Sequence, residues 1–136
     1  MTKKELSQYY WLNMEIEADK ERLAILNARA TAPQSPQLTG MPHGSGGQDK
    51  IGNLAAEIVD LSTILEEKLI KSLMLRQDIE KFIMGIEDSM TRMVFTYRCI
   101  DGMSWKEVAE SMGQYMTEDN AKQIFHRYFK KSRRSK

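Results

Sequence analysis

The side chains best suited to binding chemistry lie close together near the C-terminus of this 136-residue chain. Asn120 and Gln123 carry amides, and an amide can form two hydrogen bonds with the edge of adenine. Lys122 and Arg127 carry donors that suit guanine or phosphate. The sequence therefore predicts contacts with the base edges of DNA. The candidate base-contacting residues are Glu118, Asn120, Lys122, Gln123, His126 and Arg127.

Positive charge is concentrated at the same end of the chain. Residues 1–119 contain 13 Lys and Arg against 19 Asp and Glu, whereas residues 120–136 contain 7 basic residues and no acidic one. Such a segment suits the DNA backbone, because Lys and Arg neutralise phosphates. A solvated basic tail is the alternative interpretation. The candidate phosphate-binding residues are Lys106, Lys130, Lys131, Arg133, Arg134 and Lys136.

Turn signals divide residues 88–131 into three predicted helices that would position these side chains. The pair Asp101-Gly102 predicts the end of the first helix, because glycine readily adopts the positive φ of a helix C-cap. Apolar residues at helical spacing give this helix one apolar face. That face is formed by Met90, Met93, Val94 and Tyr97.

The second and third predicted helices have their own start and stop signals. Ser104 and Glu107 have the spacing of a capping box, and Gly113 ends the short helix that they begin. Thr117 is the predicted N-cap of the third helix. A short helix closed by glycine, followed by a helix with polar and basic residues outward, is typical of a helix-turn-helix. The inward face of the third helix comprises Ala121, Ile124, Phe125 and Tyr128.

The segment from Tyr97 to Gly113 resembles the C-terminal helix-turn-helix of bacterial sigma factors. It is still more similar to small phage and prophage proteins in which a helical N-terminus precedes this module. Their better-studied relatives are late transcription regulators of the ArpU and RinA kind. The resemblance covers residues 87–130. It implies a phage-type transcriptional regulator that binds a promoter or operator, and a location in the cytoplasm of a bacterial host cell.

Two long helices are predicted before this module. The first spans residues 3–31, and the second carries an apolar seam of several heptads, which is typical of a coiled coil. Asp19 interrupts the first seam, and Lys68 and Ser72 interrupt the second. Asp19 and Lys68 could form a buried pair that sets the register. The predicted oligomerisation seam comprises Ile51, Leu54, Ile58, Leu61, Leu65, Leu75, Ile79 and Phe82.

The predicted fold is all-α, with long antiparallel or intermolecular coiled-coil helices and a C-terminal three-helix module. Three short helices bury little apolar surface, so we expect the long helices to pack on the module or to form a homo-oligomer, with a dimer favoured. The loop between the long helices allows pairing within one chain or between protomers. The predicted divisions are a helix at 1–31, a flexible Pro/Gly/Ser loop at 32–48, a heptad helix at 49–86, a helix-turn-helix at 87–131 and a basic tail at 132–136.

Several classes of protein are not supported by the sequence. Cys99 is the only cysteine, and no apolar run approaches the length of a membrane span. His43 and His126 have no partners at metal-ligand spacing. No catalytic or phosphate-loop motif is present. We therefore expect a cytoplasmic protein that is not an enzyme and that needs no metal, cofactor or membrane.

Two other functions remain open. Small terminase subunits, which package DNA, also combine helix-turn-helix modules with helical oligomerisation hairpins. A sigma-like module could also act as an adaptor that binds RNA polymerase rather than DNA, and in a regulator the long helices could make that polymerase contact. Ring formation would favour the packaging protein, whereas an absence of salt-dependent DNA affinity would favour the adaptor.

Overall fold

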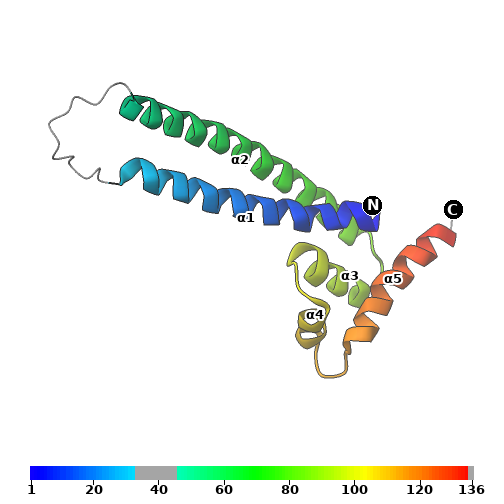
Figure 1. The fold of residues 1–136 in the computed structure, drawn as a ribbon. Coiled ribbons are helices and arrows are strands. Elements are labelled where there is room, and N and C mark those ends of the chain that lie inside the picture. The colour runs from blue at the N-terminus through cyan, green and yellow to red at the C-terminus, as the bar shows by residue number, and fades with distance from the viewer. Residues whose placement is uncertain (33–45, 135–136) are drawn as a thin grey trace. The chain divides into compact units, whose positions relative to one another are not determined.

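A computed structural model describes residues 1–32 and 46–134, and all regular structure within these ranges is helical (Figure 1). The prediction of an all-α fold is confirmed. Most of the predicted loop, residues 33–45, lies outside the described residues. The elements are α1 (Lys3–Thr31), α2 (Gly46–Met84), α3 (Ser89–Phe95), a π-helical turn (Thr96–Ile100), α4 (Trp105–Met112) and α5 (Glu118–Arg134).

The chain forms two compact units, and each of the two long helices contributes to both. The first unit, called the arm here, is Met14–Ile70 and contains the later part of α1 and the first part of α2. The second unit, called the headpiece, comprises Met1–Asn13 and Lys71–Lys136 and contains α3, α4 and α5. The candidate DNA-binding residues therefore share a unit with the start of α1.

The arm is a helical hairpin whose predicted seam is buried within one chain. Ile16 on α1 and Leu65 on α2 are buried, and the other seam residues of the arm whose side chains are described are partly buried. The side chain of Ile51 is not among those described. The apolar stripe of α2 thus meets α1 of the same chain, which is one of the two pairings that the sequence left open. The partly buried positions are Leu23, Leu26, Leu54, Ile58 and Leu61.

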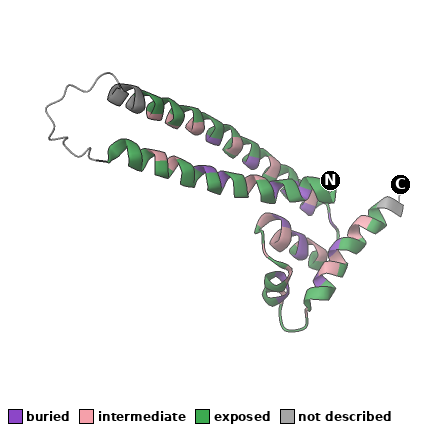
Figure 2. Ribbon diagram, viewed as in Figure 1, coloured by how far each residue is buried: buried purple, intermediate pink, exposed green. Residues whose placement is uncertain are grey.

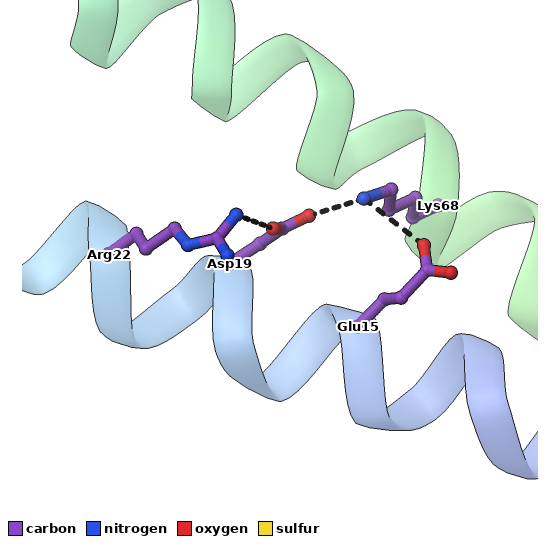
Figure 3. A network of polar contacts seen from close by, with 4 residues as sticks. All are labelled: Glu15, Asp19, Arg22 and Lys68. Carbon is purple, nitrogen blue, oxygen red and sulfur yellow. Dashed lines mark hydrogen bonds and ion pairs between the residues drawn. The ribbon is translucent and has the colours of Figure 1, made fainter.

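A polar network crosses this hairpin (Figure 3). The Lys68 ammonium lies 2.7 Å from a carboxylate oxygen of Asp19 and 3.3 Å from one of Glu15. Arg22 approaches the other oxygen of Asp19 at 3.7 Å. Asp19 is buried, and its hydrogen bond raises the pKa of Lys68. The prediction that Asp19 and Lys68 pair within the seam is confirmed.

The headpiece core combines the ends of the long helices with the three short helices. Buried positions lie on all five helices (purple in Figure 2). Leu6 and Tyr9 from α1 join Ile79 and Ile83 from α2 in this core. Leu75 and Phe82, also members of the predicted seam, are partly buried against it. The long helices therefore supply apolar surface that three short helices lack, as expected from size.

The link between α2 and α3 is held by short-range hydrogen bonds. Asp88 is the N-cap of α3, and its carboxylate accepts a hydrogen bond from the backbone N–H of Thr91 at 2.9 Å. The Arg92 guanidinium donates to the backbone carbonyls of Ile86 and Glu87. The predicted break of the long helix before this module is confirmed, since α2 ends at Met84.

The predicted apolar face of α3 is partly wrong. Val94 is fully buried, but Met90 and Met93 are 50% and 45% exposed. The core instead takes Phe95, which is fully buried, and Cys99. Phe95 lies beside Val94 on the buried face of α3. Cys99 follows within the π-helical turn, in which the Asp101 N–H donates to the Thr96 carbonyl and which holds more residues than an α turn.

Candidate nucleic-acid interface

The turns on either side of α4 follow the sequence signals. Gly102 has a φ of 67° and Gly113 a φ of 111°, in the region that favours glycine. The Ser104 hydroxyl accepts a hydrogen bond from the Glu107 N–H at 3.2 Å and also lies 3.2 Å from the Glu107 carboxylate. The predicted start and end of this helix are confirmed. In this capping box, the Glu107 carboxylate accepts a hydrogen bond from the Ser104 hydroxyl.

The orientation of α5 is fixed at its start and along its inner face. Thr117 accepts a hydrogen bond from the Asn120 N–H at 3.1 Å, as expected of an N-cap. Ala121 and Phe125 are buried, while Ile124 is partly buried. Because residues three and four apart share a helix face, burial of this face leaves the polar residues of α5 on the outside.

Aromatic contacts stabilise the packing of α5 against α3 and α4. The rings of Phe95 and Phe125 lie 4.8 Å apart between centroids, and Phe95 and Tyr128 lie 5.2 Å apart. The ring centroids of Trp105 and Phe125 lie 5.3 Å apart, and the Arg98 guanidinium lies 4.7 Å from the centroid of the Trp105 ring. Trp105 therefore covers the junction between α4 and α5, and the aromatic pairs hold α5 against α3 and α4.

The outer face of α5 brings together four of the six predicted base-contacting residues, and Lys130 of the predicted phosphate-binding residues. It borders a hollow of about 340 Å³ on the surface. Within this face, Arg127 donates a hydrogen bond to the Gln123 side-chain oxygen at 3.2 Å. Glu118 lies one turn before Lys122, at 3.9 Å. The residues lining the hollow are Asp119, Lys122, Gln123, His126, Arg127 and Lys130.

His126 lies at the centre of the positive charge of this face. Partial burial lowers the pKa of its imidazole, and the positive charges of Lys3, Lys122 and Lys130 lower it further. In the free protein, the imidazolium form is therefore disfavoured relative to an ordinary histidine. An anion bound on this face would favour the protonated form.

The participation of α1 in this surface was not predicted. Lys3 places its ammonium 5.5 Å from the centroid of the Phe129 ring, beside α5. Lys4 and Lys130 border a second hollow, which lies between the start of α1 and α5. The two lysines are some 120 positions away from α5 in the sequence, so no local pattern could link them to it.

The other predicted phosphate-binding residues lie apart from this surface or outside the described part of the chain. Lys106 borders a separate hollow with Glu110 and Glu118, where carboxylates reduce its suitability for phosphate. Lys131 is exposed on α5. The side chains of Arg133 and Arg134 and the whole of Lys136 lie outside the described residues.

Three further features that the sequence analysis considered are the lone cysteine, potential metal ligands and membrane-spanning segments. Cys99 is buried, and burial raises the pKa of its thiol to about 12, so it is an unreactive core residue. Across residues 1–32 and 46–134, no three His, Cys, Asp or Glu side chains are grouped so that they could hold a metal ion. Within the same ranges, every helix is too short or too polar to span a bilayer.

Comparisons of the chain with protein-family models, with curated proteins and with solved structures found no match. No relative therefore assigns a role to α5 or to the arm. A functional proposal has to be built on the exposed face of α5, its charges and its neighbours.

Proposed function

We propose that α3, α4 and α5 form a helix-turn-helix and that the protein binds double-stranded DNA with α5 in the major groove. The main observation in support is the outer face of α5, where Lys122, Gln123 and Arg127 are grouped. The opposite face of α5 is packed against the core. The major groove admits one α-helix, and the N-terminal residues of a recognition helix contact base edges there.

The residues of this face divide into two roles. Asn120 and Gln123 are suited to adenine, and Arg127 to guanine or phosphate. In the free protein, Arg127 is hydrogen-bonded to Gln123, so both side chains are held near each other until base edges replace that contact. Lys130 and Lys131, further along α5, are suited to the phosphates that flank the contacted bases.

The resemblance in the sequence supports a role for this binding in transcription. We infer a phage-type regulator that recognises a promoter or operator, whose arm contacts RNA polymerase or a second copy of the chain. The apolar seam of the arm is buried within one chain, so dimerisation would use another surface or an exchange of α1 between protomers. The packaging and adaptor functions are outcomes that the following experiment separates.

The proposal is tested by selecting bound duplexes from a random-sequence pool at about 50 and 200 mM salt, between which phosphate-dependent binding weakens steeply. An enriched motif at both concentrations is the expected result. Salt-sensitive binding without a motif would contradict a sequence-specific regulator and favour a packaging protein. No binding at either concentration would contradict DNA binding and favour the adaptor.

Replacing Gln123 or Asn120 with alanine should weaken binding to the selected duplex by about 1–3 kcal/mol and leave binding to random duplex nearly unchanged. The reason is that an amide distinguishes bases, whereas it adds little to phosphate binding. Fluorescence anisotropy on both duplexes measures the difference. Gln77→Ala, at an exposed amide on α2, is the matched control. An equal loss on both duplexes would show that these residues do not contact bases.

Binding to DNA should be tighter at about pH 5.5 than at pH 7.5. The pKa of His126 is lowered in the free protein by burial and by Lys3, Lys122 and Lys130, and nearby phosphates favour the imidazolium, so binding takes up a proton. The affinity for DNA should rise as pH falls through the pKa of His126 in the complex, and we expect an increase of roughly threefold or more. Affinity titrations across this range measure it. If His126→Gln retained the same pH dependence, another group would be responsible.

A further inference from the structure

The start of α1 and the later part of α5 enclose a basic hollow of about 530 Å³. Lys3 and Lys4 reach it from α1, and Lys130 and His126 reach it from α5. Two elements far apart in the sequence thus contribute positive groups to one small region. The complete lining comprises Met1, Thr2, Lys3, Lys4, His126, Phe129, Lys130 and Ser132.

The side chain of Lys3 is positioned by a contact with α5. Its ammonium lies 5.5 Å from the centroid of the Phe129 ring, within the range of a cation–π interaction. Because the two groups are close, its charge also helps to lower the pKa of His126. The first turn of α1 is therefore fixed against α5 by an aromatic residue of α5 itself.

The acidic residue nearest in sequence is already engaged within α1. The Thr2 N–H donates to the Glu5 carboxylate at 3.0 Å, and the Glu5 N–H donates to the Thr2 hydroxyl at 3.2 Å. This reciprocal capping box holds Glu5 at the helix start, and Glu5 does not border the hollow. The groups that border it are consequently basic or neutral, which suits an anion.

The hollow is continuous with the outer face of α5, because His126 and Lys130 border both. We propose that Lys3, Lys4 and Lys130 bind a phosphate of the DNA backbone next to the bases contacted by α5. This proposal rests on the proposed function. A phosphate diester carries one negative charge and accepts hydrogen bonds from ammonium groups. The first turn of α1 is then part of the DNA-binding surface.

The test is the salt dependence of DNA affinity in the full chain with Lys3→Gln and Lys4→Gln combined. Each neutralised phosphate contributes about 0.9 to the log–log salt slope, so loss of this one phosphate contact should reduce the slope by up to about 0.9. Because phosphate contacts carry no sequence information, selected and random duplexes should lose the same factor in affinity. Lys3→Arg with Lys4→Arg should retain the slope.

Lys71→Gln combined with Lys81→Gln is the matched control for net charge, since both are exposed lysines of α2 that do not border the hollow. Unchanged thermal unfolding of the Lys3→Gln, Lys4→Gln variant confirms that the fold is retained. If the unmodified chain binds DNA and the Lys3→Gln, Lys4→Gln variant keeps its slope, this proposal is overturned while the proposed function stands. If the unmodified chain binds no DNA, both are overturned.

Discussion

Replacing Phe95 with alanine should lower the free energy of unfolding of the headpiece by about 3–5 kcal/mol. Phe95 is fully buried and lies where α2, α3 and α5 meet. Its loss removes the transfer free energy of an aromatic side chain and leaves a cavity that the surrounding rings can fill only in part. Those rings belong to Phe82, Phe125, Tyr128 and Phe129.

Urea unfolding followed by circular dichroism measures this loss. Met93→Ala is the matched control, because Met93 is on the same helix and is 45% exposed; its loss should cost below about 1 kcal/mol. Since a domain is stabilised by only about 5–15 kcal/mol, the Phe95 variant should also lose DNA affinity as α5 detaches. Equal stabilities of the two variants would contradict the packing described here.

Replacing Lys68 with methionine should destabilise the arm by about 2–3 kcal/mol. The substitution removes the partner that lies 2.7 Å from the Asp19 carboxylate, whose side chain is only 5% exposed. Breaking a fully buried ion pair costs about 3–5 kcal/mol. We expect less here, because Arg22 still approaches Asp19 at 3.7 Å and Lys68 itself is 27% exposed.

The second variant of this series replaces both partners, Asp19→Leu together with Lys68→Met. Removing both charges also removes their desolvation cost, so the double variant should be as stable as the original chain or more stable. Thermal and urea unfolding of the single and double variants measure the coupling between the sites. An unaltered stability of Lys68→Met alone would show that this pair does not stabilise the hairpin.

The local features of the fold were predictable because local chemistry determines them. Glycine at positions 102 and 113 permits the positive φ that ends a helical segment, and Ser104 and Thr117 bind the free N–H groups at the next helix starts. These effects depend on residues within one turn. The apolar period of α2 likewise revealed which of its faces is buried, although not that α1 of the same chain covers it.

The non-local features were not predictable in the same way. The buried face of α3 contains Phe95 rather than Met90 and Met93, and the π-helical turn after α3 brings Cys99 into the core. A regular helical period cannot reveal such a change of spacing. Lys3 reaches α5 only because the start of α1 packs into the headpiece core through Leu6 and Tyr9. That placement depends on tertiary packing.

The central claim is that α5 binds DNA through its outer face, and the most direct test is to map the bound surface by NMR. Backbone amide shifts of the labelled full chain are recorded with and without a selected duplex. The account predicts changes concentrated at residues 118–130, with further changes at Lys3 and Lys4. Changes confined to the arm, or none at saturating duplex, would contradict it.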